Sequence, residues 1–328
     1  GHSMVPAEPR SAVPWIAALA IGLWGMGSRN SAVAAVRRWS WAAVAISWGS
    51  VAWAWAPRAA NTGSGLTLHF LDVGQGDGAV LRTPRGHWIV IDAGPRTGST
   101  DAGRRVVVPF LAREGVRELA AVVVSHAHAD HLGGIESVLG RFKAGVVLEP
   151  GERVNDPLYY GLLNDLASSA IPWHAAQRDE TFVLDGVRFT VLHPDPHWHG
   201  WGEDVNEDSL VLLVEYGSFQ ALFAGDAGFP AELEMRSRAR RVDLLKVGHH
   251  GSRGSTSEEW LDSLRPRAAI ISVGQNKYGH PSPPTLLRLS RHKVEVWRTD
   301  NDGSVTVTTD GTQMEVSSQR RSAMYDIR

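Results

Sequence analysis

Residues 125–131 read Ser-His-Ala-His-Ala-Asp-His and follow directly on a run of apolar residues. Three imidazoles and a carboxylate stand close together where a buried strand is expected to end in a loop. Alternate residues of an extended chain share a face, so His126 and His128 can reach one ion together. If a helix then begins, Asp130 and His131 turn toward a neighbouring position. The spacing predicts two metal ions about 3.5–4 Å apart, which suits hydrolysis; a polar loop of satisfied histidines is the alternative.

The composition restricts the kind of metal site. The 328 residues contain no cysteine, which excludes thiolate ligands, cysteine nucleophiles and disulfides. Any metal must therefore be bound by His, Asp, Glu or Asn, which are harder ligands. The formal net charge is only −2, but between Arg236 and Arg298 we count 13 lysines and arginines against 5 acidic residues. This excess indicates either an ordinary solvated face or a surface for a polyanion beside the metals.

Two apolar, tryptophan-rich stretches precede the histidine cluster. Residues 11–28 and 39–57 carry no charged side chain, and seven of the 13 tryptophans lie between Trp15 and Trp55. Each stretch has about the 17–25 residues that span a bilayer, and tryptophan suits the membrane interface. We therefore predict a transmembrane helix pair over residues 11–58. Buried soluble helices and a signal sequence are the alternatives.

Arginines predict the orientation of this helix pair. Arg29, Arg37 and Arg38 lie between the two apolar stretches. By the positive-inside rule the short loop is cytoplasmic, so we expect the residues after Arg58 on the extracytoplasmic side of the cell membrane.

The rest of the chain predicts one large folded domain. Residues 1–10 begin with Gly-His-Ser-Met, which resembles an expression-tag remnant, and are set aside as a leader. Residues 59–65 read as a linker and residues 66–312 as a domain in which short strands alternate with helical patterns. This mixture favours an α/β fold with two packed sheets and helices outside. The polar residues 313–328 predict a flexible tail.

Three later segments also place polar side chains at the ends of expected strands. Residues 223–226 (Phe-Ala-Gly-Asp) end in Asp226, which either bridges two ions or caps the next helix. Residues 244–252 (Leu-Leu-Lys-Val-Gly-His-His-Gly-Ser) pass from an apolar run into two imidazoles. Residues 278–281 (Tyr-Gly-His-Pro) add His280, for which an ordinary turn is the alternative. Repeated strand-end clusters favour one shared metal site.

The residues 126–131 resemble the signature of the metallo-β-lactamase superfamily, whose fold is a four-layer αββα sandwich. Other motifs resemble, more closely, the C-terminal domain of ComEC, the competence DNA-uptake channel, over about residues 66–310. These motifs are Leu71–Asp77, Ile91–Gly94, Asn206–Val211, Leu245–Ser252 and Tyr278–Pro281. In that family the domain follows membrane segments, which agrees with the helix pair predicted above.

The resemblance implies a set of metal ligands. His126 and His128 would bind one metal, Asp130 and His131 the second, and Asp226 would bridge the two. His249 would complete the second site, with His250 as a close neighbour or a substrate contact; which of the two binds metal stays open at this point.

The first metal site departs from the superfamily pattern. Most superfamily hydrolases use a further histidine there, whereas the matching segment of this chain begins with Asn206. His193, His197 and His199 lie nearby and are the alternatives. Because an amide oxygen is a harder and weaker ligand than imidazole, we expect looser binding and better tolerance of Mn²⁺. The expected cofactors are two divalent metal ions, Mn or Zn.

Further residues receive supporting roles. Asp72 and Asp77 flank a glycine-rich turn and would orient a ligating histidine or stabilise the turn. Asp130 or Asp226 would take a proton from the attacking water, and His280 would contact phosphate or protonate the leaving oxygen. Four side chains are expected to contact DNA phosphates: Lys246, Ser252, Arg253 and Lys277.

The resemblance implies a metal-dependent nuclease that degrades DNA, the non-transported strand, during competence DNA uptake. The expected partners are DNA, the membrane and the remainder of the uptake channel, without an organic cofactor. The alternatives are a hydrolase of another phosphodiester and a non-catalytic DNA-docking module of the channel.

Overall fold

The computed structural model describes residues 65–151, 154–198 and 204–327. The helix pair predicted over residues 11–58 lies outside these residues. Within the described part of the chain, no helix combines the length and the apolar character needed to cross a membrane.

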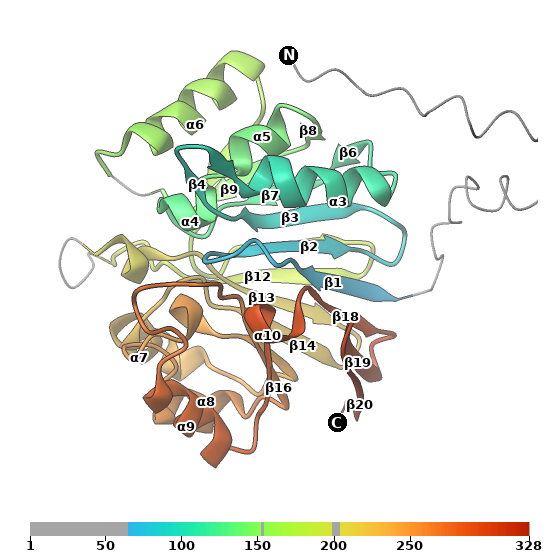
Figure 1. Cartoon of the computed structure of the whole chain (residues 1–328), viewed down its shortest axis with the longest axis vertical. Coiled ribbons are helices and arrows are strands. Elements are labelled where there is room, and N and C mark those ends of the chain that lie inside the picture. Colours follow the sequence, from blue (N-terminus) through green and yellow to red (C-terminus); the bar gives the residue numbers. More distant parts are fainter. Residues whose placement is uncertain (1–64, 152–153, 199–203, 328) are drawn as a thin grey trace, which may run out of the picture. The chain divides into compact units, whose positions relative to one another are not determined.

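Two β-sheets form the middle of the domain (Figure 1). The larger sheet has nine strands, in the order β10 (Trp173–Ala175), β9 (Val147–Glu149), β7 (Ala121–Val123), β3 (Trp88–Ala93), β2 (Gly78–Arg82), β1 (Leu66–Phe70), β18 (Val305–Thr309), β19 (Gln313–Ser318) and β20 (Ser322–Asp326). The smaller has seven, in the order β11 (Thr181–Leu184), β12 (Val187–His193), β13 (Val211–Tyr216), β14 (Phe219–Phe223), β15 (Leu244–Lys246), β16 (Ala268–Ile271) and β17 (Glu295–Arg298).

Side chains that alternate along the strands fill the space between the sheets. In β1, Leu66, Leu68 and Phe70 are fully buried while the residues between them are half-buried. The ring of Phe70 stacks on that of Phe223 from the other sheet at a centroid distance of 5.5 Å. This apolar core holds the two sheets face to face because each sheet buries one face against the other.

Helices cover the two outer faces. The helices over the larger sheet are α3 (Val108–Arg113), α4 (Ala129–Leu132), α5 (Ile135–Leu139) and α6 (Pro157–Ser169), and their apolar residues share one cluster with that sheet. The helices over the smaller sheet are α7 (Phe229–Met235), α8 (Glu258–Leu264) and α9 (Pro283–Arg291). The predicted four-layer αββα sandwich is therefore confirmed (Figure 1).

The loops that carry the candidate metal ligands follow parallel strands and meet at one edge of the sandwich. In the larger sheet β3, β7 and β9 are parallel, and the loop after β7 carries the histidine cluster. In the smaller sheet β14, β15 and β16 are parallel, and the loops after β14 and β15 carry Asp226 and His250. Ligand sites commonly lie at the carboxyl ends of parallel strands because several loops converge there.

The predicted flexible tail at residues 313–328 is wrong. Residues 313–326 form β19 and β20, which extend the larger sheet as an antiparallel hairpin. Met314 and Val316 are fully buried, while their polar neighbours face outward. A short segment with only two apolar inward positions looks polar in composition, although it has the two-residue period of a strand.

Glu232 in α7 makes the stability of this outer layer sensitive to pH. Its carboxylate accepts hydrogen bonds from the backbone of Thr256 and Ser257 at the start of α8, and burial raises its pKa to about 7. Because the folded protein keeps a proton that the unfolded chain releases, the free energy of unfolding should fall by up to about 3 kcal/mol between pH 4.5 and 7. Glu232→Gln should flatten this decline in urea titrations with a chelator present, and the exposed Glu259→Gln should not. An unchanged slope in Glu232→Gln would contradict the assignment.

Candidate metal centre

The two sheets each contribute half of a compact polar cluster. His126 and His128 lie in the extended segment after β7, and Asp130 and His131 lie in α4, which begins at Ala129. The sequence predicted this change from extended chain to helix. Asp226 comes from the other sheet, where it follows β14.

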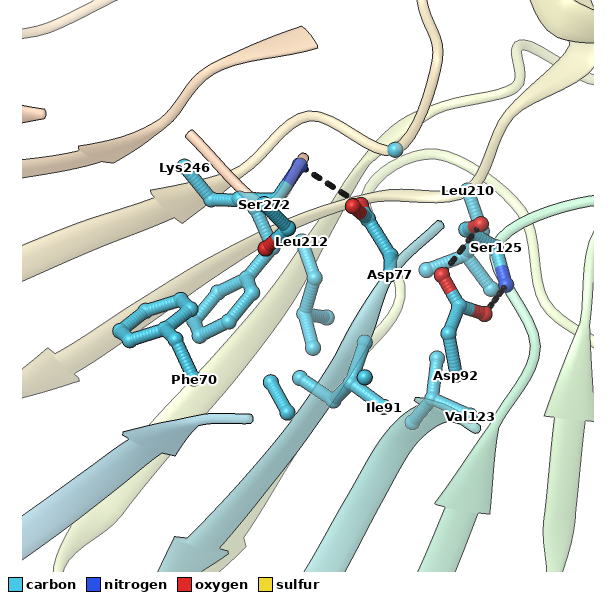
Figure 2. A pocket seen from close by; sticks show the side chains of 14 residues that line it. Phe70, Asp77, Ile91, Asp92, Val123, Ser125, Leu210, Leu212, Lys246 and Ser272 are labelled. Atoms are coloured by element: carbon cyan, nitrogen blue, oxygen red, sulfur yellow. Dashed lines mark hydrogen bonds and ion pairs between the residues drawn. The ribbon is translucent and has the colours of Figure 1, made fainter. Parts of the chain in front are cut away.

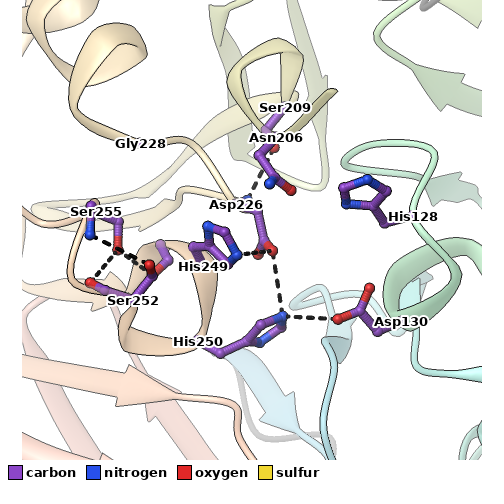
Figure 3. A network of polar contacts seen from close by, with 12 residues as sticks. His128, Asp130, Asn206, Ser209, Asp226, Gly228, His249, His250, Ser252 and Ser255 are labelled. Atoms are coloured by element: carbon purple, nitrogen blue, oxygen red, sulfur yellow. Dashed lines mark hydrogen bonds and ion pairs between the residues drawn. The ribbon is translucent and has the colours of Figure 1, made fainter. Parts of the chain in front are cut away.

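Asp226 is surrounded by imidazoles (Figure 3). Its carboxylate oxygens lie 3.2 Å from Nε2 of His131 and 3.5 Å from Nε2 of His250. The same Nε2 of His250 lies 3.4 Å from Oδ2 of Asp130. One ligand atom each from Asp77, His131, Asp226 and His250 falls within 4.8 Å of the others, so these buried groups can surround one cation.

A second set of ligand atoms lies on the other side of Asp226. Nε2 of His126 and Nδ1 of His128 are 3.1 Å apart. Figure 3 shows the side chain of Asn206 pointing into the same space as His128 and Asp226. Oδ1 of Asn206 is buried and has no hydrogen-bond partner among the described residues. An oxygen left in this state fits a metal ligand, because burial without a partner otherwise costs about 1–3 kcal/mol.

The buried carboxylates of the cluster favour positive charge beside them. Burial opposes the charged form of His250. The negative charges of Asp226 and Asp77 outweigh this effect and raise the pKa of His250 to about 10. Burial likewise opposes charge on His131, yet Asp226 and Asp92 hold its pKa well above the usual value. In the metal-free chain, protonated imidazoles thus balance the carboxylates, a role that divalent cations would take over.

Outer contacts fix which nitrogen of each imidazole faces the cluster. Nδ1 of His131 lies 2.9 Å from Oδ2 of Asp92, which also accepts a hydrogen bond from the Ser125 hydroxyl (Figure 2). Nδ1 of His250 lies 2.9 Å from the backbone oxygen of Ser272. With Nδ1 donating in both residues, Nε2 is left free to bind a metal.

Comparison with known proteins supports this centre. The family model described as "Metallo-beta-lactamase superfamily" matches residues 71–275. The chain belongs to the metallo-β-lactamase superfamily. A solved structure of this fold, "CmlA beta-hydroxylase E377D mutant", superposes with a TM-score of 0.51 at 17% identity, over 74% of this chain and 54% of that one. At that identity the likeness shows the fold alone.

Within the metallo-β-lactamase superfamily the chain is similar to larger proteins. It is 32% identical to ComE operon protein 3 of Bacillus subtilis over 256 residues, or 73% of this chain and 32% of the relative. It is 32% identical to Recombination protein 2 of Haemophilus influenzae over 251 residues, or 76% of this chain and 30% of the relative. The chain thus spans about a third of the length of these relatives.

The structure favours His250 over His249, which the sequence argument had preferred for the second metal. The His250 side chain is 2% exposed and lies inside the cluster, whereas that of His249 is 31% exposed, with Nε2 3.7 Å from Asp226. Both residues have a positive φ, of 48° and 50°, so the chain turns sharply here and brings the second imidazole inward. The sequence pattern alone does not reveal such a turn.

Two residues that the sequence assigned to supporting roles lie elsewhere. Lys246 does not reach a DNA phosphate, because it is buried with Nζ 2.6 Å from Oδ2 of Asp77 (Figure 2). Asp72 is exposed, and its carboxylate accepts a hydrogen bond from the backbone N–H of Gly74 in its own turn. Oδ1 of Asp77 lies 3.2 Å from Nδ1 of His250, and its role in orienting a ligating histidine stays a prediction.

The remaining predicted contacts lie at the rim. Arg253 and Lys277 are exposed, and Ser252 closes the turn after the two histidines by donating its backbone N–H to His249. His280 is half-buried, and its ring lies 5.4 Å from that of His249. These positions are compatible with contacts to a substrate above the cluster.

Sequence reasoning undervalued several residues that position the cluster. Asp92 contacts His131, with Oδ2 2.9 Å from Nδ1, and its place in the buried β3 is the sequence signal for such a contact. Ser209 is buried, and its hydroxyl accepts the Asp226 backbone N–H at 3.0 Å. His193 is not a ligand here, since its Nε2 lies 2.8 Å from the backbone oxygen of Glu207.

Replacing each histidine of the adjacent pair should distinguish their roles. His250→Ala should lower the number of Mn²⁺ or Zn²⁺ ions bound per chain from two to one, because it removes a buried imidazole from the second position. His249→Ala, the matched control, should still bind two. Metal analysis after dialysis measures both. Equal loss in the two variants, or loss only in His249→Ala, would contradict the geometry.

Proposed function

We propose that this chain is a metal-dependent phosphodiesterase that cleaves DNA during competence DNA uptake. The observation that carries the proposal is the buried cluster around Asp226, in which carboxylates and imidazoles from both sheets converge. Membership of a hydrolase superfamily and similarity to ComE operon protein 3 and Recombination protein 2 support it.

The donor atoms suggest two metal positions. His126, His128 and Asn206 would bind the first ion and Asp130, His131 and His250 the second, with Asp226 between them. When bound, two divalent ions supply Lewis acidity, lower the pKa of water and stabilise negative charge on phosphate oxygens. The amide ligand in the first position favours Mn²⁺ over an all-histidine zinc site.

The chain's own residues would orient the substrate and move a proton. Asp130 has a side chain 35% exposed, which makes it the cluster carboxylate open to an incoming water, and we assign it as the proton acceptor. Buried Asp226 lies between the residues that follow the two sheets, in contact with His131 and His250. It is the alternative proton acceptor. His280, at the rim beside His249, would contact the scissile phosphate.

The DNA, channel and membrane assignments rest on other features. Exposed Arg253 and Lys277 lie on loops at the rim and are suited to phosphate oxygens. This chain aligns with only about a third of the length of these relatives, so the remainder of an uptake channel is proposed as its partner. The two apolar stretches within residues 11–58 would anchor it in the cell membrane, with the catalytic domain on the extracytoplasmic side.

The first experiment is cleavage of end-labelled single- and double-stranded DNA by the full chain with Mn²⁺, Zn²⁺, Mg²⁺ or chelator. We expect metal-dependent cutting that is lost in His128→Ala/Asp130→Ala, while circular dichroism shows that the variant stays folded. Cutting that persists in the double variant would place the active site elsewhere. Two bound metals without DNA cleavage would point to a different phosphodiester, and DNA binding without metal would point to a docking module.

A further inference from the structure

The loop between β16 and α9 presents two rings in different directions. His280 faces the centre, with its ring centroid 5.4 Å from that of His249. Tyr278, two residues earlier, is 64% exposed, and its ring lies 5.7 Å from His280 at an interplanar angle of 32°. Three rings in sequence thus lead from the solvent to the cluster around Asp226.

One side chain fixes the conformation of this loop. Oδ1 of Asn276 accepts hydrogen bonds from the backbone N–H of Tyr278 and of His280, both at 3.0 Å. Nδ2 of Asn276 donates to the backbone oxygens of Gly274 and His280 at 2.9 and 2.8 Å. Four hydrogen bonds from one side chain hold the backbone of the loop in one conformation, so little backbone entropy is lost when a ligand contacts Tyr278.

The loop also packs directly against the loops that carry the centre. A Cβ atom on Gly274 would lie 2.4 Å from the carbonyl carbon of Gly74, in the turn before Asp77. A Cβ on Gly251, just after His250, would lie 2.6 Å from Cβ of Pro281. These close approaches leave no room for the loop to shift relative to the cluster.

We infer that the exposed ring of Tyr278 is a platform on which an unpaired nucleobase of the substrate stacks, beside the phosphate held at the metal centre. The inference rests on the proposed function and narrows its substrate to single-stranded or frayed DNA. A solvent-facing aromatic ring on a fixed loop is what base stacking requires, and a base stacked on such a ring strengthens binding.

The charge around the ring agrees with a nucleic-acid strand. Nζ of Lys277 lies 5.7 Å from the ring centroid of Tyr278, and Arg253 is exposed on the neighbouring turn. Both side chains are exposed, so their charges can face an incoming strand. A cation beside a stacking ring can neutralise the phosphate that follows the stacked base.

An unpaired base fits this platform better than a paired one. In a duplex, both faces of a base are covered by its neighbours, so a base reaches Tyr278 only after unstacking, which costs free energy. A single strand offers its bases without that cost. Single-stranded substrate should therefore be bound and cut in preference to a blunt duplex.

The test compares three variants of the full chain on matched oligonucleotides. Tyr278→Ala should weaken the binding of a fluorescein-labelled single strand, and raise its KM, by roughly 5- to 100-fold with kcat little changed. Tyr278→Phe should bind as the wild type does, because it keeps the ring and loses only the hydroxyl. Trp173→Ala, which removes a 48% exposed ring from the edge strand β10 of the larger sheet, is the matched control.

An abasic substrate separates stacking from a structural effect. A strand that lacks bases next to the cleaved phosphate should bind the wild type as weakly as the normal strand binds Tyr278→Ala, and the two losses should not add. Tyr278→Phe falling as far as Tyr278→Ala, or additive losses, would overturn the inference. Binding is measured with chelator as well as with metal, so it decides the role of Tyr278 even if no DNA is cleaved.

Discussion

Asp226→Asn should lower the rate of metal-dependent phosphodiester cleavage by about a thousandfold or more. The carboxylate is buried between imidazoles of both sheets, at 3.2 Å from His131 and 3.5 Å from His250. Asparagine keeps the shape of the side chain but removes its charge, so both metal positions would lose their shared anionic ligand. Single-turnover kinetics at saturating Mn²⁺ would measure the loss of rate, and metal analysis the loss of bound ions.

The control for this experiment is Asp262→Asn, which changes an aspartate whose side chain is 77% exposed on α8. It should leave the rate and the metal content unchanged. If Asp226→Asn retains more than about a tenth of the wild-type rate, the activation free energy has risen by less than about 1.4 kcal/mol. Asp226 would then not be central to the reaction.

Lys246→Met should cost about 3–5 kcal/mol of unfolding free energy in the metal-free protein. The ammonium lies 2.6 Å from Oδ2 of Asp77, and both side chains are less than a tenth exposed. Burial opposes the charged form of Asp77, but Lys246 and then His250 hold its pKa below the usual value. Methionine fills a similar volume and leaves the carboxylate buried without this partner. Urea unfolding followed by circular dichroism measures the change.

A second variant separates the loss of the charge pair from the loss of packing. Lys246→Met/Asp77→Asn removes both charges and should recover much of the lost stability, whereas exposed Lys277→Met should lie within about 0.5 kcal/mol of the wild type. A loss below 1 kcal/mol in Lys246→Met would show that Asp77 is balanced by other groups.

The sequence predicts those features of the fold and of the metal centre that depend on local spacing. The segment 125–131 predicted the metal cluster because its extended-then-helical spacing is local, and the structure places His131 beside Asp226 as that spacing requires. The strand-end positions of Asp226 and of the two histidines were also readable. Local patterns of this kind depend only on the geometry of a strand or a helix turn.

What escaped prediction depends on backbone turns and on partners distant in sequence. The positive φ values of His249 and His250 decide which imidazole faces inward, and no composition signal encodes them. Lys246 follows two buried leucines in a strand, and only its distant partner Asp77 shows why a lysine is tolerated there. The hairpin at residues 313–326 was missed because two buried residues suffice when a sheet edge is already present.

The division of the centre between the two sheets has a consequence for the whole domain. His126 to His131 follow β7 of the larger sheet, and Asp226 and His250 follow β14 and β15 of the smaller sheet. Ions bound between them would connect the two sheets. They would stabilise the folded state by a free energy that rises with the logarithm of the free metal concentration. The free energy of unfolding and the hydrolytic activity would then rise together with metal binding. Metal-free chains would be inactive and would also be degraded more easily by proteases.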